Sequence, residues 1–331
     1  MAHWTEYSTP DAELAPLLAK LPPSILGLDD PVATREKLKH MLPAMQKATQ
    51  HELPPDADYR VEDRKIPVEG GEITIRCLVP TSESGKTFPV LVWFHGGGWS
   101  MGSIDMDDYS LRRICVTLQI VIVNVDYRLV PEHPFPTSLD DCYAGLKWTA
   151  ENASLISGAV DKGFLVGGFS AGASAATIVA HRARDDAFFQ GCPLTGQALQ
   201  VPQVVHPDAC PEQYKPLFRS IEQNKDAPIL NREGLLKSNA FVGARPDDPN
   251  LFILLAPSHA NLPPTFIQVA GADPLRDDGL VYEQVLRESG VQTKFEVYPG
   301  MPHGGRAMFP NTAIYKKWDK DQLEGLRWLL R

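Results

Sequence analysis

No run of apolar residues in this sequence approaches the ~18 that a helix needs to cross a lipid bilayer. The N-terminal stretch, MAHWTEYSTPDAELAPLL, also lacks the basic segment and the apolar segment of a secretory signal peptide. We therefore expect no transmembrane helix, no membrane partner and a cytoplasmic location.

The sequence is also poor in cysteine. It has five cysteines, they are scattered, and no two of them form a C-x-x-C pair. A disulfide framework is not expected in a chain of this length, so a reducing compartment is indicated. The nearest pair of metal-ligand types is His206 with Cys210, and two ligands do not make a site. We expect no metal and no cofactor.

Positive charge is in deficit. The chain has 32 Lys and Arg residues against 41 Asp and Glu residues, which gives a formal net charge of −9. An acidic surface disfavours nucleic acid and anionic membranes as partners. The hydrophobic fraction of 43% and the charged fraction of 22% are ordinary for a globular protein, and 331 residues can enclose a large core.

The first 55 residues differ from the rest of the chain. They are rich in Pro, Ala and Leu, and the stretch PVATREKLKHMLPAM at 31–45 has helical spacing. Proline disfavours a helix interior, so Pro22, Pro23, Pro31 and Pro43 predict a break-up into short pieces. We expect residues 1–55 to form a small helical arm.

From residue 59 onward the pattern indicates an α/β fold with a largely parallel sheet. Residues 59–68 and 72–80 read as a hairpin turned at Gly70-Gly71. Apolar runs typical of buried parallel strands follow at 89–95, 119–127, 163–169, 264–271 and 293–299. Amphipathic helical patterns alternate with them at 107–118, 138–152, 171–185, 279–290 and 320–331.

The segment between Asp186 and Pro264 does not follow this alternation, because it has many prolines and few strand signals. A structureless loop of that length is uncommon inside a compact domain. We interpret about 205–245 as an inserted helical segment that forms a cap with the 1–55 arm. The remainder, 56–331, would be the catalytic domain.

Ser170 is the candidate nucleophile. It is the central residue of GFSAG at 168–172, which matches G-x-S-x-G between a buried strand and an alanine-rich helix. This strand–turn–helix context is that of a nucleophile elbow, in which small flanking residues let strand and helix approach. At the helix N-terminus, free N–H groups and the dipole favour developing negative charge.

A serine nucleophile needs a base, and the base needs an orienting acid. Asp273 follows the strand FIQVAGAD, and His303 follows the next strand, FEVYPGMPH, in the expected order serine, acid, histidine. Asp277 and Asp278 are competitors for the acid, but they begin a predicted helix, where capping and the helix dipole explain them. The sequence therefore predicts a Ser170–His303–Asp273 triad.

The loop HGGGW at 95–99 follows another strand and predicts an oxyanion hole. Glycines let backbone N–H groups turn toward a substrate oxygen. We expect Gly97 and Gly98 to donate, with the N–H of Ala171 as the third donor. His95 is interpreted as a residue that fixes the loop, and Trp99 as either a pocket wall that contacts substrate or part of the core.

Together these segments resemble the hormone-sensitive-lipase-type family of α/β-hydrolase esterases. The resemblance covers about 59–331 and includes VDYRLVPEHPFP at 125–136, DPLRDDG at 273–279 and PGMPHGG at 299–305. It implies the same nucleophile, acid, base and oxyanion hole, a helical cap over the acyl pocket, and a monomer or homodimer. Many bacterial members carry Asp where Phe169 stands, so the chain looks like a fungal-type member, some of which act on acylated secondary metabolites.

The stretch at 125–136 is interpreted as structural, with Arg128 and Glu132 paired to hold the loop. The predicted function is a cofactor-independent carboxylesterase acting on a small-molecule ester with a short to medium acyl chain. Three alternatives stay open: an acyltransferase with the same triad, a lyase or cyclase, and a small-molecule receptor. Receptors that resemble this family have lost the histidine, and His303 is present here.

Overall fold

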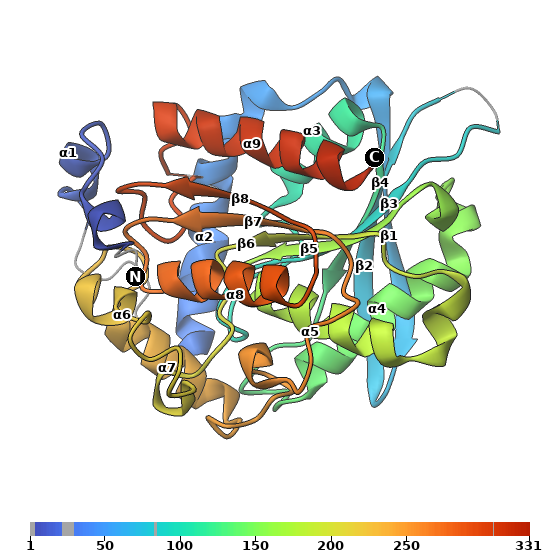
Figure 1. Ribbon diagram of the computed structural model, residues 1–331. Helices are drawn as coiled ribbons and strands as arrows, with labels where there is room; N and C mark the ends of the chain where they lie inside the picture. Colours follow the sequence, from blue (N-terminus) through green and yellow to red (C-terminus); the bar gives the residue numbers. More distant parts are fainter. Residues whose placement is uncertain (1–3, 22–29, 83–84, 307) are drawn as a thin grey trace.

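The computed structural model describes residues 4–21, 30–82, 85–306 and 308–331. Within these ranges one eight-stranded sheet runs through the molecule (Figure 1) in the order β1-β2-β4-β3-β5-β6-β7-β8. The strands are β1 (Tyr59–Val68), β2 (Gly71–Pro80), β3 (Val90–Phe94), β4 (Val121–Asp126), β5 (Phe164–Phe169), β6 (Gly196–Gln200), β7 (Thr265–Ala270) and β8 (Thr293–Tyr298).

The strand directions confirm the expected mostly parallel sheet. β1 pairs with β2 as the predicted antiparallel hairpin, β2 pairs antiparallel with β4, and the pairs from β4 to β8 are parallel. Because the parallel strands end at one edge, the loops that follow β3, β5, β7 and β8 come together there.

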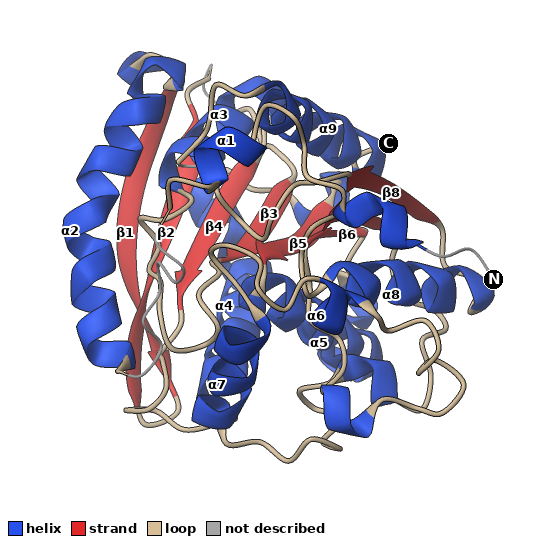
Figure 2. Ribbon diagram, turned by 90° about the vertical axis from the view of Figure 1, so that its left-hand side faces the viewer, coloured by secondary structure: helices blue, strands red, loops and turns tan. Residues whose placement is uncertain are grey.

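Helices cover both faces of the sheet. α4 (Thr137–Asn152), α5 (Ala171–Asp185) and α8 (Arg276–Glu288) pack on one face, and α3 (Asp108–Leu118) and α9 (Ala313–Leu329) pack on the other (Figure 1). Figure 2 looks toward the carboxyl ends of the central strands, where α1 (Ala15–Leu18), α2 (Pro31–Thr49), α6 (Ser220–Gln223) and α7 (Arg232–Val242) lie. In the described ranges, no helix is long and apolar enough to cross a membrane.

The core is divided by the sheet into two apolar layers. Successive residues of a strand point to opposite faces. Val92 and Val166 accordingly belong to the cluster under α4, α5 and α8, whereas Leu91 and Leu165 belong to the cluster under α3 and α9. All four side chains are fully buried, which explains why these strands read as continuous apolar runs.

The sequence analysis missed β6, which lies in the segment interpreted as having few strand signals. Its five residues, GQALQ, include a glycine and two glutamines, so no apolar alternation marks it. Gln197 and Gln200 are nevertheless buried in the sheet. The Gln197 amide donates to Thr265 Oγ1 at 3.0 Å, and the Gln200 amide donates to Gln268 Oε1 at 2.8 Å. Polar pairing between neighbouring strands replaces the apolar pattern here.

The expected fragmentation at Pro31 and Pro43 is wrong, because α2 is continuous from Pro31 to Thr49. Pro31 occupies the first turn, where its missing N–H costs nothing, and the Asp30 carboxylate caps the helix by accepting from two backbone N–H groups. Pro43 is exposed, so water can solvate the carbonyl that loses its helical partner. Pro22 and Pro23 lie outside the described residues.

The segment 205–245, predicted to be an inserted helical piece, contains α6, α7 and a short 3-10 helix at Pro207–Ala209, joined by turns. α7 contacts the glycine-rich loop after β3, because the Ser238 hydroxyl donates to Gly98 O at 2.9 Å. The role of this segment and of residues 1–55 as a cap stays a prediction.

The predicted Arg128–Glu132 pair is wrong. The Arg128 guanidinium instead grips the buried Asp141 carboxylate of α4 through two hydrogen bonds of 2.8 Å. Glu132 pairs with Arg35 of α2 at 2.6 Å. Although Arg128 and Glu132 are close in the sequence, Arg128 contacts α4 and Glu132 contacts α2.

Gly325 tests how tightly α9 packs on the sheet. A Cβ atom at this position would lie 2.2 Å from the Phe266 ring of β7, and that ring is buried. We expect Gly325→Ala to lower the free energy of unfolding by about 1–3 kcal/mol, despite the better helix propensity of alanine. At Gly191 a Cβ would meet nothing within 4 Å, so Gly191→Ala is the control. In urea titrations its free energy of unfolding should lie within about 0.5 kcal/mol of the wild-type value.

Candidate active site

The turn between β5 and α5 holds Ser170 in a backbone conformation that L-residues rarely adopt, with φ 54° and ψ −119°. Two flanking glycines make the turn possible. A Cβ at Gly168 would lie 2.4 Å from the carbonyl carbon of Gly172, and a Cβ at Gly172 would lie 2.0 Å from Phe94 O. Any side chain at either position would therefore push the strand and the helix apart. The Ser170 N–H is secured by Gln200 O at 2.8 Å.

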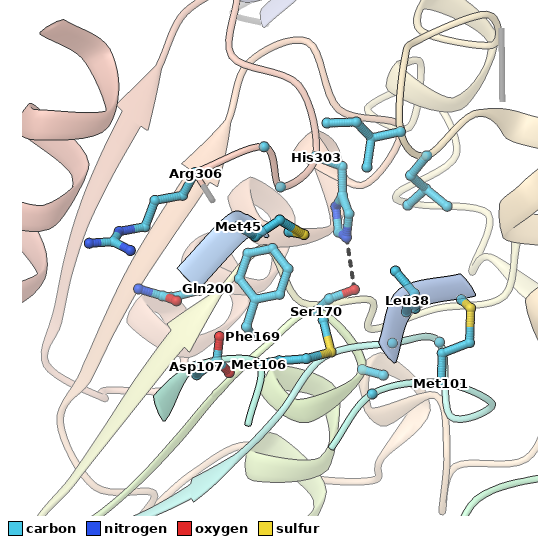
Figure 3. A pocket seen from close by; sticks show the side chains of 18 of the residues that line it. Leu38, Met45, Met101, Met106, Asp107, Phe169, Ser170, Gln200, His303 and Arg306 are labelled. Atoms are coloured by element: carbon cyan, nitrogen blue, oxygen red, sulfur yellow. Dashed lines mark hydrogen bonds between the residues drawn. The ribbon is translucent and has the colours of Figure 1, made fainter. Parts of the chain in front are cut away.

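Ser170, His303 and Asp273 come together in this structure. His303 Nε2 lies 2.8 Å from Ser170 Oγ (Figure 3), and His303 Nδ1 lies 2.6 Å from Asp273 Oδ2. The carboxylate partner requires the proton on Nδ1, which leaves Nε2 as the acceptor for the serine hydroxyl. Asp273 is fully buried, and Ser170 and His303 expose less than a tenth of their surface. This arrangement can move a proton from the serine to the histidine.

Asp277 and Asp278 lie in the first turn of α8, as expected, but neither caps it. Asp277 accepts from the backbone N–H groups of Arg219 and Ser220, and Asp278 accepts from those of Val204 and Val205. Burial raises the pKa of Asp278 well above its ordinary value, against the two backbone N–H groups that lower it. Both carboxyls therefore brace the segment after β6 rather than the helix end.

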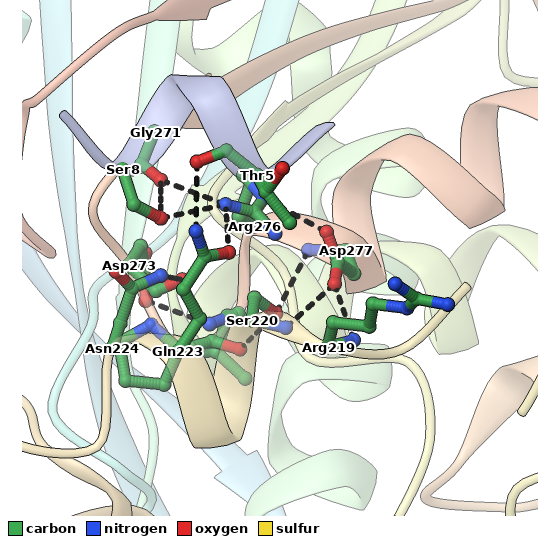
Figure 4. Close-up of polar contacts among 12 residues, drawn as sticks. Thr5, Ser8, Arg219, Ser220, Gln223, Asn224, Gly271, Asp273, Arg276 and Asp277 are labelled. Carbon is green, nitrogen blue, oxygen red and sulfur yellow. Dashed lines mark hydrogen bonds and ion pairs between the residues drawn. The ribbon is translucent and has the colours of Figure 1, made fainter. Parts of the chain in front are cut away.

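Arg276 connects the loop of Asp273 to distant parts of the chain (Figure 4). Its buried guanidinium pairs with Asp277 at 2.8 Å and donates to Ser8 Oγ and to Gln223 Oε1. Asn224, just after α6, donates to Asp273 O at 3.0 Å. The N-terminal segment and α6 thus both hold the acid loop in place, which sequence patterns did not indicate.

The glycine-rich loop after β3 places Gly97 and Gly98 beside Ser170 in the wall of one cavity. Both have positive φ, at 127° and 56°. Among the described residues, no hydrogen bond takes the N–H of either glycine. The N–H of Ala171, as the first residue of α5, lies at the helix end that leaves donors free.

His95 fixes this loop, in line with the sequence interpretation. Its Nδ1 lies 2.7 Å from Gly96 O, and its ring stacks on Tyr127 at 4.2 Å. The Tyr127 hydroxyl donates to His95 O at 2.8 Å. Burial lowers the pKa of His95, which favours the neutral imidazole that stacks on Tyr127.

The cavity has a volume of about 310 Å³ and reaches from Ser170 and His303 to α2 and α7. Trp99 lines the cavity and is only 5% exposed within the core; its contact with substrate stays a prediction. Apart from Met1, every methionine of the chain lines this cavity: Met41, Met45, Met101, Met106, Met301 and Met308. Methionine is flexible and polarisable, so this wall can adapt to apolar ligands of different shape.

Arg35 of α2 was not singled out in the sequence, yet it fastens the helix over the cavity. Its guanidinium donates to Ser100 O at 2.6 Å and to Val130 O at 2.7 Å, and it pairs with Glu132. Gln46, three turns later, donates to Asp105 O at 3.2 Å. A lone arginine on an amphipathic helix carries no sequence signal for such a role.

Comparisons with known proteins bear on the fold and on the class of reaction. Residues 91–306 match the family model described as alpha/beta hydrolase fold. A versiconal hemiacetal acetate esterase of Dothistroma septosporum is 36% identical, covering 90% of this chain and 89% of its own. Carboxylesterase NlhH of Mycobacterium tuberculosis is 36% identical over 89% and 88%. The crystal structure of vibralactone cyclase superposes with a TM-score of 0.95 and 42% identity, covering 98% of this chain and 96% of that chain.

The buried Arg276–Asp277 pair allows a direct test of how the acid loop is held. Arg276→Met leaves Asp277 buried without its cation, and breaking a buried pair costs about 3–5 kcal/mol of unfolding free energy. We expect a loss of that size in urea titrations. Arg287→Met on the same helix removes an exposed arginine that pairs with Glu283, and it should cost less than about 1 kcal/mol. Equal losses for the two variants would contradict the bracing role.

Proposed function

The chain belongs to the α/β-hydrolase family of hormone-sensitive-lipase-type esterases, and from this premise we propose that it is a carboxylesterase with a Ser170–His303–Asp273 triad. The observation that carries the proposal is the continuous pair of contacts from Ser170 Oγ through the imidazole to the Asp273 carboxylate. Esterases among the relatives support the same reaction class.

In the first step His303 Nε2 takes the proton of Ser170 Oγ, and the oxygen attacks the ester carbonyl carbon. The carbonyl oxygen becomes an oxyanion, and the N–H groups of Gly97, Gly98 and Ala171 stabilise it by donating hydrogen bonds. His303 then gives its proton to the departing alcohol, and the C–O bond to that alcohol breaks. The acyl group stays on Ser170 as an ester.

In the second step water attacks the acyl group. His303 removes a proton from the water, the same N–H groups receive the second oxyanion, and the proton returns to Ser170 Oγ as the acid leaves. Asp273 accepts from His303 Nδ1–H throughout, so the imidazole keeps its orientation and the imidazolium that forms is stabilised. No step needs a metal or a cofactor.

The cavity supports a substrate of modest size. Its volume of about 310 Å³ lies at the small end of the ~300–1,000 Å³ range of small-molecule sites. The methionine-rich wall favours an apolar body, so we propose an ester of a short to medium acyl chain. The name of the Dothistroma septosporum relative, versiconal hemiacetal acetate esterase, supports an acetyl group as the acyl part.

Cyclisation is a second candidate. The chain is 42% identical in sequence to vibralactone cyclase and 36% identical to each of the two esterases named above. The same acyl-enzyme can serve both outcomes. If a hydroxyl of the acyl chain itself attacks the Ser170 ester in place of water, a lactone leaves and no water is consumed. An external alcohol in the same place gives acyl transfer.

Ser170→Ala tests the nucleophile. Because a triad acts as a unit, we expect kcat for a short-chain 4-nitrophenyl ester to fall by about 10⁴-fold or more, with an unchanged thermal unfolding curve. Ser154→Ala, at an exposed serine outside the cavity, is the control and should keep wild-type activity. Hydrolysis undiminished in Ser170→Ala would falsify the mechanism.

Product analysis separates hydrolysis from cyclisation and transfer. A thioester or aryl ester of a hydroxy acid is supplied in H₂¹⁸O, with and without an added alcohol, and the products are identified by mass spectrometry. Hydrolysis yields the hydroxy acid with one ¹⁸O atom in its carboxyl group. A lactone without ¹⁸O, formed faster than in the Ser170→Ala variant, would show cyclisation instead, and a new ester would show transfer.

A further inference from the structure

The cavity has a polar end that the proposed mechanism does not use. Figure 3 shows Asp107, Gln200 and Arg306 on one side of the Phe169 ring, whereas Leu38 and Met101 lie on the other side of Ser170. Asp107, Gln200, Arg306 and Gln322 all line the cavity, and we call these four residues the inner polar end. They come from four different parts of the chain: the start of α3, the end of β6, the loop after His303, and α9.

Contacts on α9 bring these groups together. Arg306 pairs with Asp319 at 2.6 Å, and Gln322 follows three residues later, so it lies on the same side of the helix. Gln200 donates to Gln268, whose amide in turn donates to Trp318 O at 3.0 Å. Arg306 directly, and Gln200 through Gln268, are therefore both connected to the same turn of α9.

Several polar atoms at this end have no partner within the described residues. Gln322 is only 5% exposed, and no hydrogen bond involves its side-chain amide. Gln200 uses its NH₂ group and leaves Oε1 free, and Arg306 uses Nε and Nη2 and leaves Nη1 free. None of these atoms is completely enclosed by protein, and their residues line the cavity. A polar group of a ligand can therefore reach them without breaking a contact within the protein.

The charges around the inner polar end balance without a ligand. The guanidinium groups of Arg306 and Arg113 lie against the carboxylates of Glu52 and Asp319. Burial raises the pKa of Asp107, and the hydrogen bond from the Trp93 indole N–H offsets this only in part. The charged form of Asp107 is therefore disfavoured. A charged ligand group would upset this balance, whereas an uncharged one would not.

We propose that the inner polar end binds an uncharged hydroxyl group of the ester substrate. A hydroxyl both donates and accepts, which suits the free acceptor of Gln200, the free donor of Arg306 and the amide of Gln322, which offers both. The apolar body of the substrate would then lie along the methionine wall, with its ester at Ser170. This inference rests on the proposed ester hydrolysis and adds the class of substrate: esters whose acyl or alcohol part carries a hydroxyl.

Matched substrate pairs test the proposal. The first series compares 4-nitrophenyl esters of ω-hydroxy acids with 4-nitrophenyl esters of the methyl-ended acids of equal length. The second series compares monoacetates of diols with acetates of n-alkanols of equal length. An apolar cavity favours the methyl member, because a buried hydroxyl without partners loses its hydration. We expect the opposite for at least one length, with kcat/KM about tenfold or more in favour of the hydroxyl member.

Variants assign the preference to the site. Gln322→Leu, and Gln322→Met as a second replacement of similar shape, should abolish the preference while the methyl-ended esters are still hydrolysed. Gln203→Leu is the matched control, because Gln203 also lines the cavity but its amide already donates to Val205 O; it should keep the preference. A wild-type enzyme that favours the methyl member at every length, or a preference that survives both Gln322 variants, overturns the proposal. Failure of the enzyme to hydrolyse any ester would instead contradict the proposed function.

Discussion

Ser170 occupies a turn with a positive φ angle that only close packing of β5 against α5 can hold. Gly168 and Gly172 permit that packing, because a Cβ on either would overlap backbone atoms of the turn or of β3. The turn in turn aims the hydroxyl at His303 and leaves the Ala171 N–H at the start of α5. The placement of the glycines and the geometry of the site therefore depend on one steric constraint.

Around this rigid turn, the other groups of the site are held by contacts that reach across the chain. The Asp273 loop is braced by Arg276, by Asn224 after α6 and by the N-terminal Ser8. Helix α2, which lines the cavity, is held by Arg35, whose guanidinium donates to Ser100 O in the loop of the proposed oxyanion hole. The N-terminal segment and the 205–245 segment thus both contact the Asp273 loop and line the cavity, although they are remote from Ser170 in the sequence.

Sequence reasoning located the fold and the residues that meet in the site because each one follows an apolar strand in a parallel sheet. The apolar runs were unmistakable, and the carboxyl ends of neighbouring strands must lie together. It failed where polar side chains stabilise the structure, as in β6, which is held by glutamine pairs. It also failed at Pro43, which lies on the exposed side of an intact helix. Arg128 finds its partner 13 residues later, whereas Glu132, Asp277 and Asp278 have partners 97, 58 and 74 residues away. A local pattern cannot reveal a partner that only folding brings near.

The central claim is that Ser170 is a nucleophile made reactive by His303. Its most direct test is covalent labelling with an aryl alkylphosphonate, a reagent that an activated serine attacks at phosphorus with loss of the aryloxide, followed by intact-mass and peptide mass spectrometry. The account predicts a single adduct on the peptide that contains Ser170, and its loss in a His303→Ala variant that remains folded. An adduct on another residue, or undiminished labelling of the protein after Ser170→Ala, would contradict it.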